Sequence, residues 1–171
     1  MNLQSNDFEL FDLPQQFAQD SALLDARWKA LQREAHPDKF ATQGDAAQRL
    51  AMQWSVRINE AYQRLKEPLK RAAYLCELAG FPIQAHSNTA MPAAFLMQQM
   101  EWREALDDAS TVVQLEHLQQ QVLAAKNDLL QQGANLLDVQ GNPQAAVAVV
   151  RSLMFMDKFA HDLCKRMDAL E

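Results

Sequence analysis

The chain has 171 residues, a net charge of −6 and a hydrophobic content of 49%, with only 4 Gly and 6 Pro. This composition favours one or two globular, mainly helical domains and excludes a disordered or collagen-like chain. No apolar run reaches the length of a membrane span. Residues 91–171 hold 6 basic against 11 acidic side chains, so they lack the basic footprint that nucleic acid requires. We therefore expect no membrane or nucleic-acid partner and, for this acidic half, a basic protein partner.

The two cysteines, Cys76 and Cys164, stand far apart and form no CxxC pair. This spacing suits a reducing compartment and offers neither a disulfide nor a zinc framework. Residues 1–7 show no charged and apolar leader pattern. We therefore expect a cytoplasmic protein without a metal or another cofactor.

Hydrophobic periodicity predicts four helices in the first domain, residues 1–80. They cover residues 6–13, 21–35, 45–66 and 69–79. Asp20 or Ser21 caps the second helix, and the third buries one face made of Ala47, Leu50, Trp54, Ile58, Ala61, Tyr62 and Leu65. The loop between the two long helices is short, so they run antiparallel as neighbours. We expect Trp28 to meet Trp54 in their common core.

Three residues, His36, Pro37 and Asp38, separate the two long helices. Pro37 breaks the helix and biases His36 away from helical geometry, so the tripeptide lies on an exposed turn. Taken alone, it is a helix-stop turn in which the Asp38 side chain bonds local backbone, or half of a metal site without a second cluster of ligands. Lys29 and Arg33 share the solvent face of the preceding helix.

The second domain, residues 91–171, follows a linker over 81–90 in which His86 is a solvated loop residue. Three helices are predicted here, over about 92–108, 112–137 and 143–170. A capping-box pattern starts the second of them and an Asn-Pro pair the third. Short connections make the three an antiparallel bundle, so the chain is expected to be all-α, with an N-terminal helical hairpin and a C-terminal three-helix bundle.

The first helix of this bundle carries two apolar faces. Phe95, Trp102 and Leu106 form one face and are expected in the core. A second apolar set lies away from that face, with two acidic residues interleaved: Leu96, Met97, Met100, Glu101 and Glu104. Methionine is favoured at adaptable binding surfaces, which indicates a partner-binding face. The alternative is that Leu96 and Met100 tuck into the flank of the core and Met97 is a single exposed residue.

The N-terminal pattern resembles a J-domain, the module that activates ATP-driven chaperones of the DnaK class. The resemblance consists of the helix, His-Pro-Asp, Lys-Phe, helix order and of Ala-Tyr-x-x-Leu before Pro68. J-domains have a basic face on the helix before the tripeptide, and this face meets an acidic surface of the chaperone. The resemblance implies a chaperone-binding set of His36, Pro37, Asp38, Lys39, Lys29 and Arg33.

An N-terminal J-domain followed by an acidic three-helix domain resembles the HscB family of J-domain co-chaperones, and the match spans nearly the whole chain. It rests on residues 95–104 and 151–158, with Met100 and Trp102 standing where leucines are typical. The resemblance implies a non-enzymatic co-chaperone that binds the iron–sulfur scaffold protein IscU, delivers it to the chaperone HscA and stimulates the HscA ATPase. The implied scaffold-binding set is Leu96, Met97, Met100, Glu101, Glu104 and Phe155.

Three other functions stay open from the residues themselves. The first is a J-domain co-chaperone with a different client, and the second is a helical interaction protein with an accidental tripeptide. The third is a metal- or cluster-binding enzyme that uses His36, Asp38 and Cys76, although no further ligand cluster accompanies them.

Overall fold

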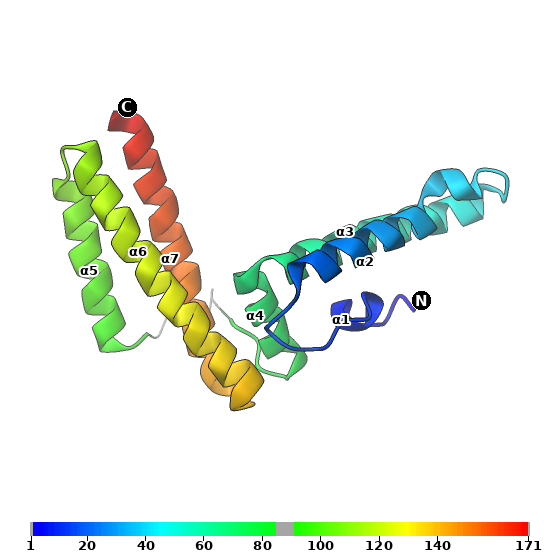
Figure 1. Cartoon of the computed structure of the whole chain (residues 1–171), viewed down its shortest axis with the longest axis horizontal. Helices are drawn as coiled ribbons and strands as arrows, with labels where there is room; N and C mark the ends of the chain where they lie inside the picture. Colours follow the sequence, from blue (N-terminus) through cyan, green and yellow to red (C-terminus); the bar gives the residue numbers. More distant parts are fainter. Residues whose placement is uncertain (1, 85–90, 171) are drawn as a thin grey trace. The chain divides into compact units, whose positions relative to one another are not determined.

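The computed structural model describes residues 2–84 and 91–170, and its regular elements within these ranges are all helical (Figure 1). The elements are α1 (Asp7–Leu10), α2 (Ser21–Ala35), the 3-10 helix η1 (Pro37–Phe40), α3 (Asp45–Lys66), α4 (Pro68–Leu78), α5 (Ala93–Asp108), α6 (Val112–Ala134), the π-helix η2 (Asn135–Val139) and α7 (Pro143–Leu170). The predicted all-α fold class is confirmed. Most of the expected linker, with His86, lies outside the described residues.

Contacts within the chain divide it into two compact units, Met1–Leu75 and Cys76–Glu171, called here the N-terminal and C-terminal units. The division falls within α4, whereas the sequence pattern predicts a domain boundary at residue 80, which stays a prediction. Every helix in the described ranges is too short or too polar to span a bilayer.

The N-terminal unit is built on an antiparallel hairpin of α2 and α3, whose predicted bounds are confirmed. The expected contact of Trp28 with Trp54 is wrong, because Trp28 stacks on Tyr62 with ring centroids 4.5 Å apart. Tyr62 lies eight residues beyond Trp54 on α3, a rise of about 12 Å. Leu50 was expected in the core but is 47% exposed. It lies beyond the end of α2, which Ser55 marks by donating a hydrogen bond to the Ala35 carbonyl at 3.3 Å.

A buried carboxylate fixes α1 to the hairpin. Asp7 is 1% exposed, and its two oxygens lie 2.7 Å from a guanidinium nitrogen of Arg57 and 3.1 Å from Nε of Arg64. Its backbone N–H donates to the hydroxyl of Tyr74 on α4 at 3.0 Å. A buried charge is tolerated when it is paired with opposite charges in this way. This network therefore ties α1 and the first part of α4 to α3.

The C-terminal unit is a three-helix bundle of α5, α6 and α7. Its core contains Trp102, Leu106, Ala109, Leu115, Leu118, Val122, Met156, Phe159 and Leu163. Thr111 and Gln114 form the predicted capping box. Helix α6 ends at Ala134 and continues as η2, so the regular α-helix is shorter than predicted. A Cβ atom on Gly133 would lie 3.6 Å from Val149 of α7, an ordinary van der Waals distance, so the packing of these helices, side by side in Figure 1, does not require a glycine here.

Candidate functional site

The His36–Asp38 turn links the end of α2 to η1. His36 has extended backbone angles (φ −62°, ψ 128°) and caps both helices. Its ring Nδ1 accepts a hydrogen bond from the Asp38 backbone N–H at 3.2 Å and lies 3.6 Å from Oδ2 of Asp38. The local bond thus differs from the one in the helix-stop alternative, because the His36 ring rather than the Asp38 carboxylate accepts the backbone hydrogen bond. Since Nδ1 is the acceptor, a neutral ring carries its proton on Nε2.

Positive charge surrounds this turn without being neutralised. Lys29 and Arg33 are exposed on α2, and Lys39 is exposed on η1. Arg33 Nε donates to the Lys29 carbonyl at 3.4 Å, but none of the three cations belongs to an ion pair within the described residues. By contrast, Arg27 on the same helix lies 3.5 Å from Asp12. The three cations are therefore available to an acidic partner.

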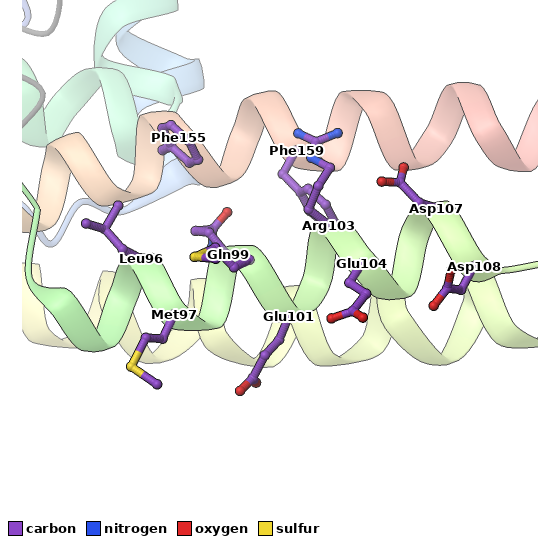
Figure 2. Close-up of a pocket in the computed structure, with 11 residues that line it drawn as sticks. Leu96, Met97, Gln99, Glu101, Arg103, Glu104, Asp107, Asp108, Phe155 and Phe159 are labelled. Carbon is purple, nitrogen blue, oxygen red and sulfur yellow. The ribbon is translucent and has the colours of Figure 1, made fainter.

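All six residues predicted to bind the scaffold are brought together in one groove, called here the α5–α7 groove. It has a volume of about 900 Å³ and is lined by Leu96, Met97, Gln99, Met100, Glu101, Arg103, Glu104, Asp107 and Asp108 of α5 and by Phe155 and Phe159 of α7. Figure 2 shows Leu96 and Gln99 pointing from α5 toward α7, whereas Met97 and Glu101 point away from it.

Four of the apolar side chains that line the α5–α7 groove are exposed. Leu96 is 44%, Met97 63%, Met100 71% and Phe155 42% exposed. The alternative in which Leu96 and Met100 are covered by the flank of the core is therefore wrong. Phe155 meets Phe95 edge to face with ring centroids 6.2 Å apart, which holds the Phe155 ring in place. A contiguous exposed apolar surface of this kind is typical of an interaction site.

A row of carboxylates continues the groove along α5. Glu101, Glu104, Asp107 and Asp108 are exposed, and none of them forms an ion pair within the described part of the chain. The one cation of the groove, Arg103, is already paired with Asp162 at 3.2 Å and lies over the Phe159 ring, 5.1 Å from its centroid. The groove therefore combines apolar surface with uncompensated negative charge.

Sequence reasoning missed five groove residues: Gln99, Arg103, Asp107, Asp108 and Phe159. The two aspartates follow Glu104 at a spacing of three and four residues, which continues its helical face and could have revealed them. Gln99 lies four residues after Phe95 and three before Trp102, so it shares their core face despite being polar.

The alternatives with a metal site require a cluster of ligands. Within the described ranges, no group of three or more His, Cys, Asp or Glu side chains is placed to hold an ion. Cys76 is fully buried. Burial, followed in size by the nearby charge of Glu77, raises the pKa of the Cys76 thiol to about 11.

Comparisons with known proteins agree with these features. The family model for the HSCB C-terminal oligomerisation domain matches residues 91–163. Two relatives are each named co-chaperone protein HscB homolog. The one from Burkholderia multivorans is 48% identical and covers 100% of this chain and 99% of its own length. The one from Cupriavidus taiwanensis is 47% identical and covers 99% of this chain and 97% of its own length.

Solved structures show the same architecture. Chaperone HscB from Vibrio cholerae superposes with a TM-score of 0.84 at 37% identity, over 98% of this chain and 100% of that one. Human co-chaperone protein HscB superposes with a TM-score of 0.90 at 24% identity, over 96% of this chain and 83% of that one. This likeness supports the fold alone. Full-length identity near one half, together with the matched C-terminal domain, shows that this chain belongs to the HscB family of co-chaperone proteins.

Proposed function

We propose that this protein is a cytoplasmic J-domain co-chaperone of iron–sulfur cluster assembly, which binds the scaffold protein IscU and presents it to the DnaK-class ATPase HscA. One observation carries the proposal. A single chain combines an exposed His36–Asp38 turn with unpaired cations in one unit and an exposed apolar and acidic groove in the other. Such a chain has the means to bind two partners of different charge.

The N-terminal unit recognises the chaperone through polar and charged groups. Lys29, Arg33 and Lys39 attract an acidic surface of the ATPase, because their charges are not neutralised within the described residues. His36 then offers Nε2 for hydrogen bonding, while its Nδ1 is held by the Asp38 backbone. The unit acts by stabilising a hydrolysis-competent state of the chaperone and needs no general base of its own.

The C-terminal unit holds the scaffold in the α5–α7 groove. Leu96, Met100 and Phe155 provide the apolar contact, and the neighbouring carboxylates select a partner with basic side chains. Binding both partners on one chain raises their effective local concentration. The scaffold and the chaperone are thereby brought together even if their direct contact with each other is weak.

The proposal is tested by single-turnover ATP hydrolysis of HscA with this protein, with and without IscU. We expect this protein to accelerate hydrolysis alone and the scaffold to increase the acceleration further. Direct binding of IscU is measured in parallel by calorimetry. Acceleration without any scaffold binding would favour a J-domain co-chaperone with another client. Scaffold binding without acceleration would contradict the role of the N-terminal unit.

A further inference from the structure

Gln99 stands out among the polar residues of the C-terminal unit. It is 6% exposed and lies on the core face of α5, between Phe95 and Trp102. Neither its amide nitrogen nor its amide oxygen has a hydrogen-bond partner. The other buried polar side chain described in this unit, Ser152, donates to the Ala148 carbonyl at 3.1 Å. An unpaired buried amide is destabilising, and native proteins retain few of them.

The unpaired amide belongs to the α5–α7 groove. Gln99 is one of the residues that line it, and Figure 2 shows its side chain pointing from α5 toward α7. The surrounding side chains include Leu96, Met100 and Phe155, all of them substantially exposed. Methionine has three rotatable bonds and adapts its shape easily. Exposed Leu96 and Met100 can therefore move aside to let an incoming chain reach the amide, while Phe155 stays in place against Phe95.

The chemistry of the carboxamide selects the group that would pair with it. The side chain offers two N–H donors and one carbonyl acceptor, and it carries no charge. Gln99 lies buried on the apolar core face of α5, so burying a charged group of the partner against it would be costly. The backbone N–H and C=O of one extended residue are neutral and point to the same side of the chain, so this donor and acceptor match the carboxamide in a two-bond pair.

We propose that Gln99 is a specificity-determining residue of the α5–α7 groove, and that its side-chain amide pairs with the backbone N–H and C=O of one residue of the bound scaffold. The inference rests on the proposed function, because it assumes that the scaffold occupies the groove. Apolar and acidic residues then supply attraction, while Gln99 fixes the register of the bound segment. A partner that does not pair Gln99 gains nothing at this position, since the amide stays buried and unpaired as in the free protein.

Gln99→Met tests this role, because it keeps the length of the side chain and removes both polar groups. We expect the Kd for IscU to rise about tenfold through the lost hydrogen bonds, while Tm stays unchanged or rises. The matched control is Gln98→Met, the same replacement at the neighbouring position of α5, which does not line the groove. This control should bind IscU like the parent protein.

The outcomes separate this inference from the proposed function. No binding of IscU by the parent protein would overturn the proposed function itself. Binding by the parent protein with an unchanged Kd for Gln99→Met would overturn only the role of Gln99. A lower Tm for Gln99→Met would also overturn it, because the amide would then stabilise the free fold, for example through an internal water.

A second measurement requires no variant. The side-chain NH₂ resonances of Gln99, followed by NMR in the full chain, should shift when saturating IscU is added. Unchanged resonances in the complex would overturn the inference, whereas a shift confined to Gln99 and its neighbours in the groove would support it.

Discussion

The His36–Asp38 turn of the N-terminal unit and the α5–α7 groove of the C-terminal unit expose opposite chemistry. The turn presents a histidine ring and unpaired cations, with side chains that are more than half exposed at His36 and Asp38. The groove presents apolar side chains beside unpaired carboxylates. Exposed charges act mainly on association rate and are screened by salt, whereas desolvated apolar contacts control dissociation. The difference suits a transient contact at the turn and a longer-lived one in the groove.

The largest expected effect is at the groove. Leu96→Ala, Met100→Ala and Phe155→Ala together should weaken IscU binding by about 100-fold or more, because truncating a central apolar contact costs about 1 kcal/mol or more for each side chain. Tm should change little, since these side chains are exposed and contribute weakly to the fold. Calorimetry and thermal unfolding measure the two quantities.

A matched control for the groove variant removes exposed apolar side chains elsewhere in the same unit. Val113, Leu123 and Val139 are 72%, 56% and 76% exposed and do not line the groove. Their replacement by alanine should leave IscU binding unchanged. Equal losses in both triple variants would mean that binding depends on general surface hydrophobicity rather than on the α5–α7 groove.

The second effect should separate the two surfaces. His36→Gln should reduce stimulation of the HscA ATPase about tenfold or more, because it removes a hydrogen-bonding ring at the exposed turn. Binding of IscU should not change. His117→Gln makes the same replacement at an exposed position of α6 and should leave both activities intact. Full stimulation by His36→Gln would show that the His36 ring is not needed at the chaperone contact.

A smaller effect is expected at the basic face of α2. Lys29→Ala with Arg33→Ala should weaken HscA binding about fivefold at low ionic strength, and the loss should shrink at high salt because exposed charges are screened. Lys158→Ala with Lys165→Ala changes the net charge equally on α7 and should have little effect. A loss of the same size at all salt concentrations would indicate a folding defect instead.

The smallest effect concerns thiol chemistry. The reactivity of the two cysteines reports whether the C-terminal unit stays folded in the groove variants. At pH 8 only about one in a thousand Cys76 thiols is ionised when its pKa is about 11. Exposed Cys164 should therefore react with dithionitrobenzoate while Cys76 does not, and both should react after unfolding. Equal rates for both thiols in the native protein would show that Cys76 is accessible.

The same raised pKa gives a pH dependence of stability. The folded-state pKa of Cys76 lies above the ordinary value of 9.0, so the folded thiol keeps its proton where the unfolded one loses it. The contribution to stability is present below about pH 9 and is lost as the pH rises toward 11. Cys76→Ser should flatten this part of the stability profile.

Sequence patterns determined much of the fold. The bounds of α2 and α3 follow from hydrophobic periodicity and from the break at Pro37, which are local properties of the chain. The start of α6 follows from its capping box for the same reason. The surplus apolar face of α5 was also visible, because three helices need only one buried face each.

Tertiary structure decided the features that depend on where neighbouring helices end and cross. Leu50 is exposed because α2 stops opposite Ser55, and Trp28 stacks on Tyr62 rather than on Trp54 because the register of the hairpin is set across its whole interface. Helical periodicity gives the face of a residue but not the height at which a partner helix covers it. The unpaired amide of Gln99 became apparent only when α7 was placed beside α5, since satisfying a buried polar group is a property of its surroundings.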